Sequence, residues 1–220
     1  MKQQGLNVYV ISSPGERLKL ISNQEGIQYK EVSMERNINI IKDFISLVKL
    51  LIVLFKIKPD IVHTHTPKAS LLGMIASWIL RIPVRIYHVH GLVLETSTGL
   101  KRKVLMVTER TTAFLATHVF CVSRSLQNQM IKHQLCEPDK TKVILNGTIN
   151  GVDSRNKFKP NKKLSIEADG LRKKINFSED DVVIGFVARF TKDKGIEDLY
   201  YVWTDIKKKY RNTKLLLVGD

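Results

Sequence analysis

The sequence predicts an α/β fold in which helices cover a parallel, doubly wound sheet. Short apolar runs alternate with segments of helical periodicity along most of the chain, an order that is typical of β-α-β units in a parallel sheet. Hydrophobic residues make up 43% of the 220 residues, which is enough for a substantial core and argues against global disorder. Several apolar runs end in polar or glycine-containing corners, where open α/β sheets bind their ligands.

The first predicted elements are a strand and a long helix. The run VYVISSPG, residues 8–15, predicts a strand and a turn. Residues 38–58 are the most hydrophobic segment, and their apolar side chains recur at helical spacing: Ile41, Phe44, Ile45, Val48, Leu51, Ile52 and Phe55. The uncharged run there, residues 50–55, is far shorter than the roughly 18 residues of a membrane span. We expect a helix buried on most of its sides; the alternative is a helix on a membrane surface with its lysines towards lipid phosphates.

Two strands and a helix are predicted next. Pro59 ends the long helix, and IVHTHTP, residues 61–67, predicts the second strand. Residues 68–80 predict a helix, with apolar positions at Leu71, Leu72, Ile75, Ile79 and Leu80. Pro83 then introduces VRIYHVHG, which predicts the third strand.

The first part of the chain is expected to end with a helix, a strand, a second helix and a short strand. Residues 100–116 predict the first of these helices, and HVFCVS follows as a strand in which Cys121 is buried. Ser123 is a candidate N-cap for a helix over residues 125–134. KVILNG, residues 142–147, predicts the short strand.

The composition divides the chain into two domains. Residues 1–150 are expected to form the first domain, and residues 151–163, rich in Asn, Lys and Asp, a connector. Residues 164–220 predict a polar helix at 164–174, the strand DVVIGFVA, a helix at 196–210 and the strand TKLLLVG. Two strands and a helix bury too little apolar area to be stable alone, so the second domain is expected to be incomplete.

The charge of the chain favours anionic partners. Its net charge is +15, which suits nucleic acid, an acidic membrane surface or phosphorylated small molecules. Aromatic residues are few and are not interleaved with the basic ones, so a nucleic-acid-binding domain is supported by charge alone. The two cysteines lie in no metal-ligand or redox spacing, which favours a reducing compartment.

Histidines stand where two predicted strands end. His63 and His65 close the second strand, and His88 and His90 close the third. We expect His63 and His65 to point to opposite faces of their strand. Because no Asp or Cys completes a familiar ligand set, no metal site is predicted. His65 and His90 are expected either to have a structural role or to form a hydrogen bond with a substrate hydroxyl.

Two cations follow the strand of the second domain. In GFVARFTKDKGIEDL the apolar run stops at Arg189, and Lys194 and Gly195 precede a predicted helix. Arg offers a rigid fork of donors and Lys a mobile charge, and both suit a diphosphate that gains charge as a bond breaks. The start of the helix adds backbone N–H donors. The alternative is a lysine-rich corner exposed to solvent.

Other familiar sites are absent from the sequence. It contains no GxGxxG, which weakens a dinucleotide site, and no GxxxxGK[ST]. It also contains no GxSxG, so an α/β-hydrolase nucleophile is unsupported.

Five segments together resemble family 4 glycosyltransferases of the GT-B fold: PDIVHTHTPKAS, VRIYHVHGL, THVFCVSRSL, NGVD and GFVARFTKDKGIEDL. The chain is most similar to the bacterial branch that builds capsular, exopolysaccharide and related lipid-linked glycans, and the resemblance covers residues 5–220. It implies two Rossmann-like domains facing across a cleft. Residues 1–150 would hold the acceptor, and residues 164–220 would begin the domain that binds the nucleotide-sugar.

The resemblance also implies roles for particular residues. Arg189 and Lys194, with Gly195, match the family's positions that bind the donor diphosphate, and His90 matches the histidine near the reacting sugar. The acceptor side of the cleft is matched by a further set: His65, Thr66, Lys68 and Gly91. The segment 150–153 matches an inter-domain signature, for which a structural role is expected.

The activity that the resemblance implies is retaining transfer of a sugar, expected to be UDP-linked, to a polyprenyl-diphosphate-linked or glycan acceptor. Neither a metal nor another cofactor is expected. An anionic acceptor in a membrane leaflet suits the basic charge. We therefore expect a cytoplasmic protein attached peripherally to the inner face of the cell membrane, with no nucleic-acid partner.

Two departures from the family pattern limit this expectation. The family's first strand with its glycine-containing loop and its E-x7-E motif are not found, so the sequence is expected to be truncated at both ends and weakly active or inactive alone. A non-catalytic remnant or accessory subunit that binds an acceptor lipid or a partner chain is the alternative. A sugar-nucleotide epimerase shares the architecture, but HTHTPKAS and NGVD favour the transferase.

Overall fold

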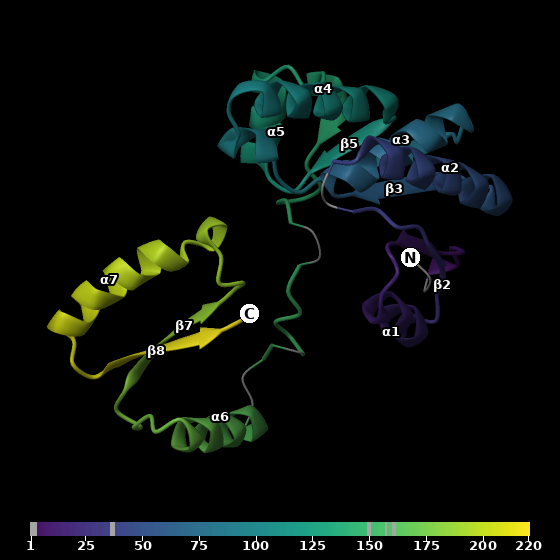
Figure 1. Cartoon of the computed structure of the whole chain (residues 1–220). Coiled ribbons are helices and arrows are strands. Elements are labelled where there is room, and N and C mark those ends of the chain that lie inside the picture. The colour runs from purple at the N-terminus through teal and green to yellow at the C-terminus, as the bar shows by residue number, and fades with distance from the viewer. Residues whose placement is uncertain (1–3, 36–37, 149–150, 157, 160–161) are drawn as a thin grey trace. The chain divides into compact units, whose positions relative to one another are not determined.

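The computed structural model describes residues 4–35, 38–148, 151–156, 158–159 and 162–220. The chain divides into two compact units, Met1–Gly151 and Val152–Asp220, and each is described by itself (Figure 1). All the strand pairs among these residues are parallel. The predicted α/β class with parallel, helix-connected strands is therefore confirmed.

The first unit holds two parallel sheets. In the first, β1 (Tyr9–Ser12) pairs with β2 (Gln28–Glu31), and α1 (Glu16–Glu25) connects them. The second has the strand order β3-β4-β5-β6. Its strands have these bounds: β3 Ile61–His65, β4 Val84–Val89, β5 His118–Cys121 and β6 Thr141–Lys142. Because β3 and β4 pair in parallel, their carboxyl ends lie side by side.

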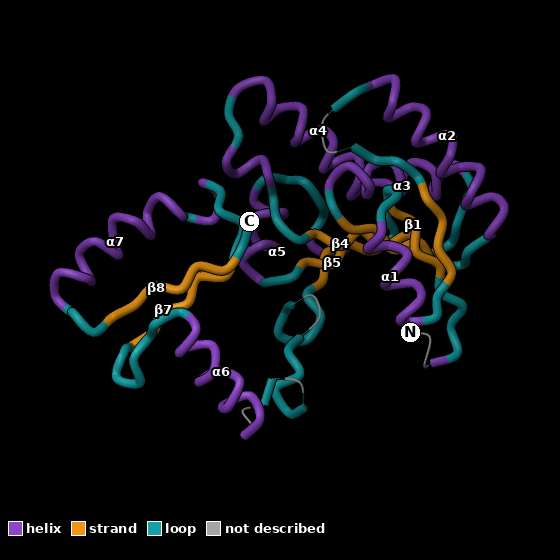
Figure 2. Tube along the Cα trace, turned by 60° about the horizontal axis from the view of Figure 1, so that its bottom comes forward, coloured by secondary structure: helices purple, strands orange, loops and turns teal. Residues whose placement is uncertain are grey.

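Helices connect and cover these strands (Figure 2). Their bounds are α2 Ile40–Ile57, α3 Pro67–Ile79, α4 Gly99–Leu115 and α5 Arg124–Lys132, with short 3-10 helices at Val93–Thr96 and Pro138–Lys140. Local chemistry sets several of their ends. The Asn39 side chain accepts a hydrogen bond from Lys42 N at the start of α2, and Pro67 takes the first position of α3. Ser123 accepts from Leu126 N at 3.2 Å, so its predicted role as the N-cap of α5 is confirmed.

The core of this unit consists of two apolar clusters. The larger one lies around β4, β5 and α4 and includes Met74, Val89, Val119, Cys121 and Met130. In the smaller one, α2 and α3 pack together through Leu50, Leu54, Leu72 and Ala76, with Val32 and Ile82. Ile11 of β1 and Val62 of β3 both pack against the smaller cluster.

The prediction that the long helix is buried on most of its sides is wrong. Only Ser46, Leu50 and Leu54 of α2 are buried. The apolar side chains expected in the core are largely exposed, with Phe44 and Phe55 each 65% exposed and Ile41 76% exposed. The reason is that α2 contacts the molecule along one narrow face, and its second apolar face has no partner among the described residues. None of the described helices is long and apolar enough to cross a membrane.

Two further differences concern short elements. α1 and β2, which lie between the first strand and the long helix, were not predicted from the sequence. The strand expected over residues 142–147 is also wrong, because β6 ends at Lys142. Leu145 and Gly147 have left-handed φ angles of 53° and 82°, and extended pairing cannot continue through them.

The second unit contains α6 (Lys162–Lys174), β7 (Val182–Val187), α7 (Ile196–Lys209) and β8 (Thr213–Val218). β7 and β8 are parallel and in register from Val182↔Thr213 to Val187↔Val218. Among the described residues of this unit only Thr213 is buried. The unit therefore has almost no core of its own.

Candidate functional site

The carboxyl ends of β3 and β4 bring four histidines together. The strands pair His65 with His88. The ring centroids are 4.4 Å apart for His63 and His65, 5.3 Å for His63 and His88, and 4.8 Å for His88 and His90. We call His63, His65, His88 and His90 the histidine cluster. The expectation that His63 and His65 point to opposite faces is wrong, because residues two apart in a strand lie on the same face.

Hydrogen bonding in the cluster is incomplete. His65 Nδ1 lies 2.8 Å from His90 Nε2, so one of these two nitrogens donates and the other accepts. The Nε2 atom of His63 and the Nδ1 atom of His88 are buried, and among the described residues neither has a hydrogen-bond partner. His88 is only 9% exposed, whereas His65 and His90 face solvent. The cluster therefore offers two nitrogens whose bonds a ligand or water can satisfy.

The surroundings favour the neutral form of three of these imidazoles, those of His63, His65 and His88. Burial, together with the charges of the neighbouring histidines, lowers the pKa of His65 to about 4. Burial also lowers the pKa of His63 and of His88, with the charge of His90 as a second cause. At neutral pH these three side chains can accept a hydrogen bond from a hydroxyl group.

The same geometry is compatible with a metal ion. One ring nitrogen from each of His63, His65 and His88 lies within 4.8 Å of the others. Neutral imidazoles are ligands for Zn²⁺ and related ions. The absence of a metal therefore stays a prediction.

Three of the predicted acceptor-side residues lie where β3 passes into α3: His65 ends β3, Thr66 connects the two elements, and Lys68 lies in the first turn of α3. Thr66 has φ 67° and ψ 145°, an unusual backbone conformation for a β-branched residue. The Lys68 ammonium lies 2.7 Å from the Asp43 carboxylate of α2, with both side chains mostly buried. Gly91, which directly follows His90 in the sequence, is exposed. The structure thus places Lys68 in an ion pair between α2 and α3.

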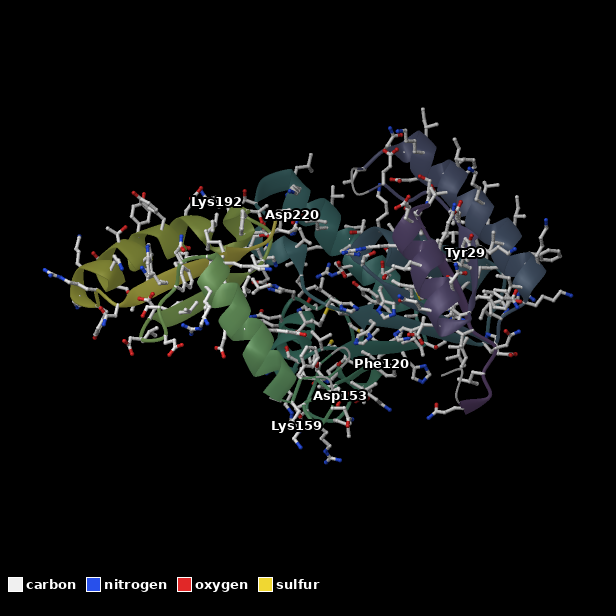
Figure 3. All side chains as sticks on the ribbon, turned by 90° about the horizontal axis from the view of Figure 1, so that it is seen from below. Tyr29, Phe120, Asp153, Lys159, Lys192 and Asp220 are labelled. Carbon is white, nitrogen blue, oxygen red and sulfur yellow. The ribbon has the colours of Figure 1, made fainter. Side chains whose placement is uncertain are left out.

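In the second unit, the two predicted phosphate-binding cations flank one carboxylate. Arg189 Nη2 is 3.5 Å and Lys194 Nζ 3.9 Å from Asp193 Oδ2. All three side chains are exposed, at 54%, 46% and 61%. Gly195 has φ 74° and precedes α7. We call Arg189, Asp193, Lys194 and Gly195 the cationic corner; Lys192 lies beside it at the same end of the unit as Asp220 (Figure 3).

At the cationic corner, a bound anion can replace the Asp193 carboxylate as the partner of the two cations. A carboxylate shared between two exposed cations forms weak ion pairs in water. A diphosphate, with more charge and more acceptor oxygens, can displace the carboxylate from both. Asp193 was missed by the sequence reading, although its position between Lys192 and Lys194 is visible in KDK. His63 and His88 were likewise left out of the candidate site, because their convergence depends on the register of β3 and β4.

Comparison with known proteins identifies relatives of the chain. Residues 1–149 match the family described as Glycosyltransferase Family 4. The whole chain is 36% identical over 220 residues to the capsular polysaccharide biosynthesis glycosyltransferase CapM of Staphylococcus aureus, and it covers 56% of that protein. It is 34% identical over 163 residues to the UDP-Gal:alpha-D-GlcNAc-diphosphoundecaprenol alpha-1,3-galactosyltransferase of Escherichia coli, matching 72% of this chain and 39% of that protein. The chain thus spans about half the length of CapM and less of the second relative.

Solved structures share the fold. A glycosyltransferase from Rickettsia africae ESF-5 matches all of this chain and 54% of its own, with a TM-score of 0.69 and 20% identity. Anabaena Alr3699/HepE in complex with UDP-glucose matches 96% of this chain and 61% of its own, with a TM-score of 0.65 and 18% identity. UDP-GlcNAc 2-epimerase from Neisseria meningitidis matches 98% of this chain and 60% of its own, with a TM-score of 0.63 and 19% identity. Because the fold is common to transferases and an epimerase, it does not separate these activities.

Proposed function

The chain belongs to glycosyltransferase family 4, and on that premise we propose that it acts in capsular polysaccharide synthesis, transferring a sugar from a nucleotide-sugar to a lipid-linked or glycan acceptor. The observation that carries the proposal is the similarity of the entire chain to a capsular polysaccharide glycosyltransferase. We include in the proposal a UDP-linked donor and retention of configuration at the transferred sugar.

In this proposal the cationic corner binds the donor. Arg189 and Lys194 contact the diphosphate after Asp193 has moved aside, and the first turn of α7 after Gly195 supplies backbone N–H groups. The two cations also stabilise the negative charge that develops on the leaving nucleotide. Because this stabilisation comes from side chains, we propose that neither a metal ion nor another cofactor takes part.

The histidine cluster is assigned to the acceptor side. We propose that His90 lies against the reacting sugar as the catalytic residue. His65, Thr66, Lys68 and Gly91 would line the acceptor site. The lowered pKa of His65 supports its place on the acceptor side, because an imidazole that is unprotonated at pH 7 can accept a hydrogen bond from a sugar hydroxyl.

The exposed face of α2 supports a proposed attachment to the inner face of the cell membrane. By helical geometry its exposed apolar residues share one side of the helix: Ile41, Phe44, Ile45, Val48, Ile52 and Phe55. Lys42, Lys49 and Lys56 follow one edge of that side. Apolar insertion flanked by lysines suits an anionic lipid surface, where a polyprenyl-diphosphate acceptor would also lie. Nucleic acid is not proposed as a partner.

Calorimetric titration of the purified chain with UDP and UDP-sugars tests the donor site. We expect binding that persists in EDTA and that falls at least about tenfold in Arg189→Ala and in Lys194→Ala, because each removes a charge-assisted contact. Lys192→Ala is the matched control and should bind as the unmodified chain does. Binding that depends on added metal would contradict the metal-free proposal. Absence of binding at millimolar UDP would favour the non-catalytic subunit instead.

A further inference from the structure

Three members of the histidine cluster have the spacing of ligands to a transition-metal ion. One ring nitrogen from each of His63, His65 and His88 lies within 4.8 Å of the others. A tetrahedral zinc ion with Zn–N bonds of about 2.0–2.1 Å holds its ligand nitrogens about 3.4 Å apart. Closing from 4.8 Å or less to this separation is within the reach of side-chain rotation, because the outer torsion of a histidine side chain is soft.

The pairing of β3 with β4 holds these three rings together. His65 and His88 are direct partners in the parallel register. His63 precedes His65 by two residues and lies on the same face of β3, with 4.4 Å between the two ring centroids. Ligands on paired strands are positioned more precisely than ligands on loops. The sheet therefore arranges the three imidazoles before an ion binds.

The buried side of the cluster presents nitrogens that lack partners. Among the described residues, His63 Nε2 and His88 Nδ1 are buried without a hydrogen bond, and the His88 side chain is only 9% exposed. Proteins rarely leave buried polar atoms unsatisfied. When the proton of each ring is on its other nitrogen, these two atoms present lone pairs, and coordination to an ion satisfies both.

His90 fits the role of a positioning residue for His65. The His90 Nε2 atom is 2.8 Å from His65 Nδ1. Histidines that bind metals usually donate the N–H of their other nitrogen to an acceptor, which fixes the tautomer and the orientation of the ring. With His65 Nδ1 as the donor, His65 Nε2 keeps the lone pair that binds the ion. Both side chains face solvent, so an ion can reach the cluster from this side.

We propose that His63, His65 and His88 bind one divalent transition-metal ion, with Zn²⁺ as the expected ion, His90 as the residue that orients His65, and water at the fourth position. Three neutral imidazoles suit Zn²⁺ and related ions. Mg²⁺ and Ca²⁺ require oxygen ligands, which the three imidazoles do not offer. The net charge of +15 also disfavours a cation that is held by charge alone, so the imidazole bonds select the ion.

The bound ion has no part in sugar transfer. It occupies the lone pair of His65, which the proposed function assigns to the acceptor side, and it therefore opposes acceptor binding. This consequence rests on the proposed function, whereas the metal site rests on the geometry of the cluster. The two can fail separately, because zinc binding is measured without UDP and without an acceptor.

Calorimetric titration of the metal-free whole chain with ZnCl₂ tests the site. We expect one tightly bound ion per chain and no comparable binding of MgCl₂. His63→Gln and His88→Gln should each weaken zinc binding at least about hundredfold, because each removes a ligand. His90→Ala should weaken it only about tenfold, because it removes the partner of a ligand. The matched control is His118→Gln, which changes an exposed histidine of β5 outside the cluster and should bind zinc as the unmodified chain does.

Amide hydrogen exchange of the unmodified chain gives a second readout that does not depend on how the variants fold. Zn²⁺ should slow exchange at least about tenfold in both residues 61–65 and residues 84–89, because an ion bound to both strands stabilises their paired form. Absence of this protection would overturn the proposal. So would equal zinc binding by His63→Gln, His88→Gln and His118→Gln, or binding of Mg²⁺ as tight as that of Zn²⁺, and water would then satisfy the buried nitrogens.

Discussion

His65 is the residue whose titration the structure alters most clearly. Its pKa lies at about 4, below the ordinary value of 6.5. Between these values the unfolded chain binds a proton at this position and the folded chain does not, so acid favours unfolding. His63 and His88 shift in the same direction.

We therefore expect the stability of the first unit to be constant above pH 6.5 and to fall as the pH is lowered from 6.5 towards 4. Urea unfolding followed across this range measures it. His65→Gln should flatten the dependence, whereas His118→Gln, outside the cluster, should not. A profile for His65→Gln identical to that of the unmodified chain would show that the cluster does not control acid stability.

A second residue-scale prediction concerns a buried pair in the core. Tyr87 donates a hydrogen bond to the Glu109 carboxylate at 2.5 Å, and burial raises the pKa of Glu109. Tyr87→Phe leaves this buried carboxyl without that donor, so we expect a loss of about 1–3 kcal/mol in the free energy of unfolding. Tyr200→Phe, at an exposed site, should change stability by less than about 0.5 kcal/mol. A Tyr87→Phe variant as stable as the control would mean that water replaces the hydroxyl.

At the scale of one element, α2 carries the clearest unassigned surface. Phe44 and Phe55 are each 65% exposed on its apolar face, and burial of such a side chain contributes about 1.5–3 kcal/mol. The double variant Phe44→Ser/Phe55→Ser should therefore bind phosphatidylglycerol vesicles at least about tenfold more weakly than the unmodified chain in a sedimentation assay. The control is Phe114→Ser, which changes an exposed side chain of α4. Equal binding to anionic and neutral vesicles at low salt would argue against the electrostatic part of the proposal.

The elements show which features local sequence determines. Apolar periodicity predicted α3, and the Ser123 cap predicted the start of α5. Which face of α2 is buried depends on its partners, so the periodicity located the helix but assigned the wrong face to the core. α1 and β2 are short and polar, and their local signal is correspondingly weak. The candidate site follows the same rule, because the sequence indicated His65 and His90 while strand register adds His63 and His88.

Across the whole molecule, burial is unequal between the two units. All the buried apolar residues of the described chain lie in the first unit, and Thr213 alone is buried in the second. Few buried contacts mean a low free energy of local opening. The second unit also carries the cationic corner, so the proposed donor site rests on the less stable part of the chain.

This inequality predicts a graded pattern of amide hydrogen exchange. Protection should be high in β4 and β5 and low in β7 and β8, because only the former pair lies in a core. A ligand that binds the folded form alone stabilises it by about 2.7 kcal/mol at a concentration of 100 times its Kd. Saturating UDP should therefore slow exchange selectively in β7 and α7. The effect should vanish in Arg189→Ala and Lys194→Ala but persist in Lys192→Ala. High protection of β7 and β8 without ligand would show that the second unit is stabilised by contacts other than its own buried residues, and the argument from burial would fail.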